Sequence, residues 1–285
     1  MDENQKNSII NFDKETKSLV SYATSKGNLP KWHIDDFWYK TDAFGYENLS
    51  ECLISDLLKY SNIYNYVEYK MIKGIYNSEV KSFSKSKNFL NENENLLTFY
   101  RLYFLETGNE LSKEIYNYKD VKERISFVVD FISNTYHLNQ AAKTITSILE
   151  LDMFFLNEDR HFNNFALIRN IKEDAFSFAP LFDNGLSLLS DTNEYNISVD
   201  VYKNMDKVKS KPFSNSFEEQ CECAESLYGS VLKFTFTKND VLKEIDKYRS
   251  FYSNELIERV ITIIFEQMRK YQYLFEDDMK TKIAL

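Results

Sequence analysis

Short runs of alternating apolar and polar residues in the first ninety positions predict a small β-sheet. We place these strands at residues 18–22, 31–34, 37–40, 66–72 and 79–83, with a tight turn at Asp35 and Asp36. Residues 46–60 carry leucine and isoleucine at helical spacing, so one helix follows the third strand. Residues 1–15 are polar and of mixed charge, and we expect a solvated segment there.

After residue 91 the periodicity becomes helical. Apolar residues recur every third or fourth position over residues 96–105, 121–136, 141–156, 241–252 and 255–274. Residues 159–190 break this pattern, and we expect a hairpin with strands at 165–168 and 175–181. The two patterns predict an α+β, two-lobed fold. Residues 1–90 would form a small antiparallel-sheet N-lobe with one helix, and residues 91–285 a larger, mostly helical C-lobe.

The bulk composition narrows the class of protein and its compartment. The chain has 285 residues and a formal charge of −9, which argues against binding nucleic acid through excess Lys and Arg. Its three cysteines, at positions 52, 221 and 223, are too few for a disulfide framework, and we expect reduced thiols. No apolar signal segment opens the chain, and no stretch approaches the ~20 apolar residues of a membrane span. We therefore expect a cytoplasmic protein that binds neither nucleic acid nor membranes.

Polar residues around the predicted hairpin form an ordered set that suits phosphoryl transfer. Asp159 follows a predicted helix, Asn164 lies five residues later at the start of the hairpin, and Asp183 closes it in an Asp-x-Gly step. Kinases use such a set: the first Asp accepts the hydroxyl proton, and the later Asn and Asp hold Mg²⁺ through hard oxygen atoms. Because a hairpin brings its two ends together, Asn164 and Asp183 could reach one ion.

Each of these residues has a plainer interpretation when it is taken alone. Asp and Asn are common turn and cap residues. His161 alone would be a hydrogen-bonded structural histidine, and the three histidines have no zinc-site spacing. The order of helix, Asp, five-residue step, strand, turn, strand and Asp-x-Gly is what favours a catalytic site.

Residues 151–167 and 179–188 resemble the HipA-like serine/threonine kinases. The resemblance rests on Asn157-Glu158-Asp159-Arg160-His161-Phe162-Asn163-Asn164-Phe165 and on Ala179-Pro180-Leu181-Phe182-Asp183-Asn184-Gly185. Its Asp-Arg-His-x-x-Asn signature is shared with phosphatidylinositol kinases. The resemblance implies a two-lobed kinase with ATP and Mg²⁺ as cofactors, Asp159 as catalytic base, Asn164 and Asp183 as metal ligands, and His161 beside the nucleotide. HipA has a further N-terminal subdomain, so we expect here a compact, stand-alone kinase domain.

Kinase chemistry also requires a strand lysine for the nucleotide phosphates and a helix glutamate that holds it. Lys40 ends the third predicted strand and Glu51 lies in the next helix, with Glu47 as the rival glutamate. Both could instead be solvated charges. By order along the chain, the phosphate-covering loop would include Ser25, Lys26 and Gly27, whose backbone N–H groups could bind anions. By resemblance and order, the adenine hinge would be Lys87, Asn88 and Phe89.

The resulting hypothesis is a kinase that transfers the γ-phosphate of ATP to a Ser or Thr hydroxyl of a protein, with autophosphorylation. Its partners would be that protein substrate and an antitoxin-like or regulatory protein, as in toxin–antitoxin systems. Two alternatives stay open: a lipid or small-molecule kinase of the same fold, and a pseudokinase that acts as an interaction module. We expect residues 207–217, which are basic and carry serines, to be a mobile surface loop that could contact a substrate or be autophosphorylated.

Overall fold

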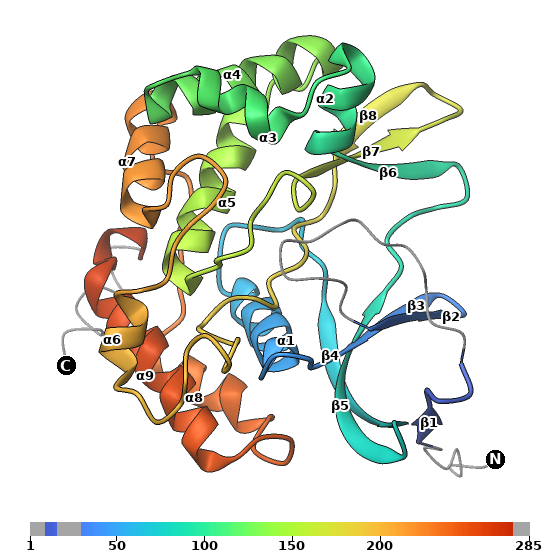
Figure 1. The fold of residues 1–285 in the computed structure, drawn as a ribbon, viewed down its shortest axis with the longest axis vertical. Helices are drawn as coiled ribbons and strands as arrows, with labels where there is room; N and C mark the ends of the chain where they lie inside the picture. The colour runs from blue at the N-terminus through green and yellow to red at the C-terminus, as the bar shows by residue number, and fades with distance from the viewer. Residues whose placement is uncertain (1–8, 16–29, 276–285) are drawn as a thin grey trace.

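The structure, a computed structural model, describes residues 9–15 and 30–275. A twisted five-stranded sheet with one helix packs beside a larger, mostly helical part that carries a second, three-stranded sheet (Figure 1). The predicted α+β, two-lobed kinase-like fold is confirmed. The boundary that we placed near residue 90 stays a prediction.

The larger sheet has the strand order β1-β4-β5-β3-β2. Its strands are β1 (Ile10–Asn11), β2 (Lys31–Ile34), β3 (Phe37–Thr41), β4 (Tyr69–Tyr76) and β5 (Glu79–Lys87). The two-residue turn at positions 35 and 36 sets a register in which Lys31 lies opposite Lys40. Neighbouring strands run antiparallel, except that β1 runs parallel to β4, so the expectation of a purely antiparallel sheet is wrong at that edge. The strand expected at residues 18–22 lies outside the described residues.

The expectation of a solvated lead-in is wrong for residues 10–12. Phe12 is 1% exposed and stacks on Phe83 with ring centroids 4.0 Å apart. It also contacts Trp32 and Tyr39 on the same face of the sheet. A two-residue strand is too short to show a pattern in the sequence, and here a single aromatic ring provides the packing.

Helix α1 (Glu47–Leu58) is buried along its whole length. It packs on the sheet, and three hydrogen bonds tie it to residues 187–190: Tyr46 Oη donates to Leu188 O, Ser50 Oγ to Ser187 O, and the Tyr46 amide to Ser190 O. Gly45 allows this close approach, because a Cβ atom there would lie 2.1 Å from Ser190 O. The helix is therefore fixed to the segment that follows Asp183.

The remaining elements form the helical part. They are β6 (Glu94–Thr98), α2 (Phe99–Thr107), α3 (Leu111–Glu114), α4 (Val121–Tyr136), α5 (Ala141–Phe155), β7 (Ala166–Asn170), β8 (Ala175–Phe178), α6 (Val201–Met205), α7 (Phe217–Tyr228), α8 (Lys238–Asp246) and α9 (Asn254–Lys270), with 3₁₀ turns at Ile115–Asn117 and Gln272–Leu274. No helix in the described ranges is both long and apolar enough to cross a membrane.

One prediction about this part is wrong, and one helix was missed. Residues 96–105 do not form one helix, because residues up to Thr98 pair with β7 and the Thr98 side chain then caps α2 by accepting from the Arg101 amide. Helix α7 was not predicted. Its buried face is narrow and includes Phe217, Cys221 and Ala224, and glutamates fill much of the rest.

Asp42 links the end of β3 to the helical part. Its two oxygens accept from the Asn48 amide at 2.7 Å and from Tyr252 Oη at 2.7 Å. Burial, together with the nearby charge of Glu47, raises the pKa of Asp42 from an ordinary value of 3.8 to about 7, although these hydrogen bonds lower it.

The pKa of Asp42 predicts a change in stability with pH. Between pH 3.8 and 7 the native carboxyl keeps a proton that the unfolded chain has lost. The stability that protonation provides is thus complete below pH 3.8 and is lost as the pH rises through 7. Asp42→Asn should remove this dependence, so its free energy of unfolding should rise relative to wild type by up to about 1.4 kcal/mol per pH unit in that window. Urea unfolding at several pH values measures the difference, and parallel curves would contradict the prediction.

Candidate active site

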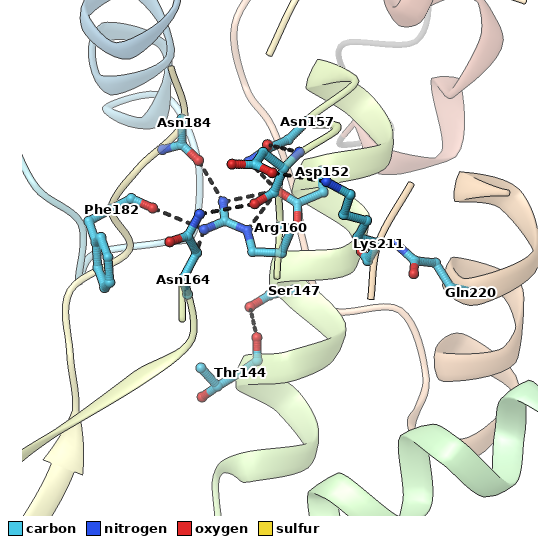
Figure 2. A network of polar contacts seen from close by, with 11 residues as sticks. Thr144, Ser147, Asp152, Asn157, Arg160, Asn164, Phe182, Asn184, Lys211 and Gln220 are labelled. Atoms are coloured by element: carbon cyan, nitrogen blue, oxygen red, sulfur yellow. Dashed lines mark hydrogen bonds and ion pairs between the residues drawn. The ribbon is translucent and has the colours of Figure 1, made fainter. Parts of the chain in front are cut away.

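The side chain of Arg160 organises the loop that contains Asp159 and Asn164. Arg160 is 0% exposed and its guanidinium binds the Asp152 carboxylate of α5 through Nε, at 2.9 and 3.1 Å, and through Nη2, at 3.0 Å. Figure 2 shows Arg160 at the centre of a network that also includes Asn184 and the backbone of Phe182. Nη2 donates to Asn184 Oδ1 at 2.7 Å. Arg160 thus joins the end of α5 to the segment around Asp183.

One nitrogen of Arg160 brings the two candidate metal ligands close together. Nη1 donates to the backbone carbonyl oxygen of Asn164 at 3.2 Å and to that of Phe182 at 2.9 Å. The predicted hairpin between them is observed as β7 and β8, with Leu167 opposite Phe178, but β7 runs further than the predicted strand at 165–168, and β8 ends at Phe178 and not at residue 181. The sequence predicted this hairpin but assigned no role to the arginine that connects its two ends.

The oxygen atoms available at this point suit Mg²⁺. The Asn164 amide nitrogen donates to the Asp159 carbonyl oxygen at 3.0 Å, which leaves the amide oxygen as the atom that would ligate. Asp183 supplies a carboxylate, and one or two hard oxygens from protein are typical of magnesium sites. Asp183 has a φ of 63°, a left-handed conformation that Asp tolerates better than most residues. Such backbone strain often occurs at functional positions.

Lys40, Glu51 and Asp183 form a partly buried charge cluster between β3, α1 and the hairpin. Lys40 Nζ lies 2.7 Å from Glu51 Oε1 and 2.8 Å from Asp183 Oδ1. The Glu51 side chain is 2% exposed, whereas those of Lys40 and Asp183 are 22% and 29% exposed. The structure therefore brings together a lysine, its proposed glutamate partner and a proposed metal ligand from distant parts of the chain.

The charges of Lys40 and Asp183 shift each other's pKa. Burial alone would lower the pKa of Lys40, but the carboxylates of Asp183 and Glu51 outweigh it and raise that pKa well above its usual range. Burial would likewise raise the pKa of Asp183, but the Lys40 ammonium lowers it to about 2. Asp183 is therefore ionised at neutral pH, as a ligand for a hard cation must be.

The structure separates Glu51 from its rival, Glu47. Glu47 accepts backbone N–H groups from Ala43, Phe44 and Gly45 at 2.6 to 3.2 Å. It therefore shapes the turn that leads into α1 and does not contact Lys40, whereas Glu51 does.

Lys31 is a candidate residue that the sequence analysis missed. It lies opposite Lys40 in the β2–β3 hairpin, on the same face of the sheet. Burial, and then the charge of Lys40, lower the pKa of Lys31. Like charges on neighbouring strands are unfavourable unless an anion lies between them. The two-residue turn at positions 35 and 36 was a sufficient signal, because it fixes this register.

The segment 207–217 is not the mobile surface loop that we expected. Phe213 is fully buried and contacts the ring of Phe162 edge-on, with centroids 5.6 Å apart. Lys211 Nζ lies 3.0 Å from Asp159 Oδ1. The sequence could not show these contacts, because they join positions about fifty residues apart.

The remaining predicted residues are placed less closely around the cluster. His161 Nε2 lies 3.7 Å from Asp159 Oδ2. Lys87 is largely exposed at the end of β5, and the Asn88 amide donates to Asp36 O at 2.8 Å. The ring centroid of Phe89 lies 6.2 Å from that of Phe182, the residue that precedes Asp183. Their roles stay predictions, and the loop with Ser25, Lys26 and Gly27 lies outside the described residues.

Comparison with solved structures identifies the fold. The proinflammatory kinase CtkA of Helicobacter pylori matches with a TM-score of 0.62 and 16% identity, over 97% of this chain and 99% of that one. HipA of Shewanella oneidensis, from a toxin–antitoxin system and solved with HipB and operator DNA, matches with a TM-score of 0.51 and 10% identity. That match covers 86% of this chain and 60% of HipA. No protein-family model and no curated protein matches the sequence.

The predicted resemblance to HipA-like kinases is therefore confirmed at the level of the fold. The likeness to CtkA spans nearly the whole of both chains. At these identities, the likeness says nothing of the acceptor or of the cofactors.

The Arg160–Asp152 pair gives a direct test of the network. Arg160→Met should lower the free energy of unfolding by about 3–5 kcal/mol, because it leaves the Asp152 carboxylate buried without its cation. The double variant Asp152→Leu/Arg160→Met should recover part of that loss, since no charge then stays buried. Urea unfolding measures both. A single variant within about 1 kcal/mol of wild type would show that the pair does not hold the loop.

Proposed function

We propose that the chain is an ATP- and Mg²⁺-dependent kinase that transfers the γ-phosphate to a Ser or Thr hydroxyl of a protein and phosphorylates itself. The observation that carries this proposal is the contact of Lys40 with both Glu51 and Asp183. A kinase must hold the nucleotide phosphates, the metal and the acceptor in one geometry, and it needs little other chemistry. The kinase-like fold supports the proposal. The proposal names the class of acceptor and not the particular substrate protein.

Each residue has a role in the proposed reaction. Lys40 would bind the nucleotide phosphates, and Glu51 would orient Lys40. Asn164 and Asp183 would hold Mg²⁺, and the ion would neutralise the negative charge that develops on the phosphates. Asp159 would accept the proton of the acceptor hydroxyl while the hydroxyl oxygen forms a bond to the γ-phosphorus. The bond between the γ-phosphorus and the oxygen that bridges it to the β-phosphorus would break, and its electron pair would leave with ADP.

The partners follow from the same proposal. The substrate would be a protein with an accessible Ser or Thr, in the cytoplasm. The HipA structure contains HipB, so an antitoxin-like or regulatory protein is the second proposed partner. The expectations of no direct contact with nucleic acid and of a cytoplasmic location stay predictions.

Loss of either catalytic carboxylate should abolish transfer and leave the fold intact. Asp159→Asn removes the base, and Asp183→Asn removes the charged metal ligand, so each should reduce phosphate transfer by about 10³-fold or more. The full chain is incubated with Mg²⁺ and γ-labelled ATP, and autophosphorylation is followed by intact mass in steps of about 80 Da. Asp174→Asn is the matched control, since Asp174 is 73% exposed in the same hairpin.

The outcomes separate the proposal from its alternatives. The same assay is run with casein and with vesicles that contain phosphatidylinositol. Transfer to lipid alone would establish a lipid kinase, and no transfer to any acceptor by wild type would establish a pseudokinase. Undiminished transfer by Asp159→Asn would refute the role of this carboxylate.

Substitution of Glu51 and of Glu47 in α1 should have different effects on activity and stability. Glu51→Gln leaves Lys40 with one carboxylate partner, and it should reduce transfer by about 10- to 100-fold with a small change in stability. Glu47→Gln weakens the acceptor of three backbone N–H groups, and it should cost about 1–3 kcal/mol of stability. Transfer rates and urea unfolding of both variants test this. Equal loss of activity without loss of stability in Glu47→Gln would contradict the assignment.

A further inference from the structure

Lys211 lies directly on the carboxylate that we propose as the catalytic base. Its Nζ is 3.0 Å from Asp159 Oδ1, while the side chain keeps 38% of its surface exposed and that of Asp159 only 8%. Figure 2 shows Lys211 reaching the loop of Arg160 from the opposite side to Asn184 and Phe182. A cation thus stands beside Asp159 in addition to those grouped around Lys40.

The segment that carries Lys211 is anchored on both sides. The carbonyl oxygen of Lys211 accepts from Gln220 Nε2 of α7 at 3.2 Å, and Ser210 Oγ donates to Ser214 O at 2.7 Å. Phe213 is buried against Phe162, and its carbonyl oxygen accepts from Arg124 Nη1 of α4 at 2.9 Å. The backbone around Lys211 is therefore fixed, so any displacement of Nζ would come from rotation of its four-carbon side chain.

We propose that Lys211 binds the phosphoryl group during transfer and leaves Asp159 when the nucleotide and acceptor are in place. This inference rests on the proposed function. A base must lie within about 2.6–3.2 Å of the hydroxyl that it deprotonates. The hydroxyl oxygen must in turn be about 3–3.5 Å from the phosphorus. An ammonium that can touch the base can therefore also reach the oxygens of the γ-phosphate.

The chemistry of lysine fits this role. The acceptor proton goes to Asp159, the γ-phosphorus bonds to the acceptor oxygen, and the electron pair of the broken bond leaves on ADP. The ammonium group of Lys211 would offer three N–H donors, which would neutralise charge on the transferring oxygens. Before substrate binds, its pairing with Asp159 keeps the lysine at the place where that charge will develop.

A purely structural ion pair is the competing interpretation. With 38% of the lysine side chain exposed, such a pair contributes little to stability. A structural role would make no distinction between ATP and ADP, because it involves no contact with the γ-phosphate. Nucleotide discrimination is therefore the decisive measurement.

The experiment compares wild type with Lys211→Met, Lys211→Arg and Lys209→Met in the full chain. Lys209 is the matched control, because it is exposed in the same segment and lines a hollow against α9. The rate of transfer at saturating Mg-ATP should fall about 10²-fold in Lys211→Met and recover in part in Lys211→Arg. By calorimetry, affinity for Mg-AMP-PNP should fall about 10-fold in Lys211→Met, and affinity for Mg-ADP should stay within about 2-fold. Lys209→Met should match wild type.

Each result separates this inference from the proposed function. If wild type transfers phosphate and Lys211→Met does so at the same rate, or binds ADP and AMP-PNP equally weakly, the inference is overturned and the kinase assignment stands. If wild type transfers none, both are overturned. A loss specific to the γ-phosphate supports the role of Lys211.

Discussion

The candidate site depends on one buried guanidinium. Arg160 takes a charge into the interior, which is costly unless every donor is satisfied, and here Asp152, two carbonyl oxygens and Asn184 Oδ1 satisfy it. Its planar fork is the reason that a lysine could not replace it, because a single ammonium cannot bind a carboxylate through two nitrogens and two separate carbonyls at once. The same bonds decide where Asn164 and Asp183 lie. The folding energy of this network and the positions of the two proposed metal ligands therefore have the same source.

A second constraint comes from α1, which is buried along its length between the sheet and the segment after Asp183. Glu51 cannot move away from Lys40 without breaking that packing. Asp183, held in a left-handed conformation, lies between these two anchors: Arg160 fixes the residues on either side of it, and Lys40 holds its carboxylate. The strained backbone at Asp183 is tolerated because several independent contacts hold this residue in place.

The sequence predicted the parts of the site that local order can encode. The hairpin, the five-residue step from Asp159 to Asn164, and Lys40 on its strand all follow from spacing and periodicity. The structure has the hairpin as β7 and β8, and Lys40 in β3. Contacts that depend on distant pairing did not follow. Residues 94–98 form a strand because they pair with β7. Phe12 is buried because it packs on residues of the sheet that lie far from it in the sequence, such as Phe83. Lys211 belongs to the same class, since nothing within its own segment indicates that it reaches Asp159.

The distribution of charge explains how a chain with a net charge of −9 could bind a polyanion. Lysines gather around the proposed site: Lys40 is bound to Glu51 and Asp183, Lys211 to Asp159, and Lys31 lies opposite Lys40. Local fields, rather than the net charge, control such a site. In the proposed function, Glu51 would stay on Lys40, and phosphate oxygens would take the place of Asp183 on Lys40 and of Asp159 on Lys211, so the charges need little rearrangement. Phosphoryl transfer requires such preorganised charged groups from a protein that performs no covalent step.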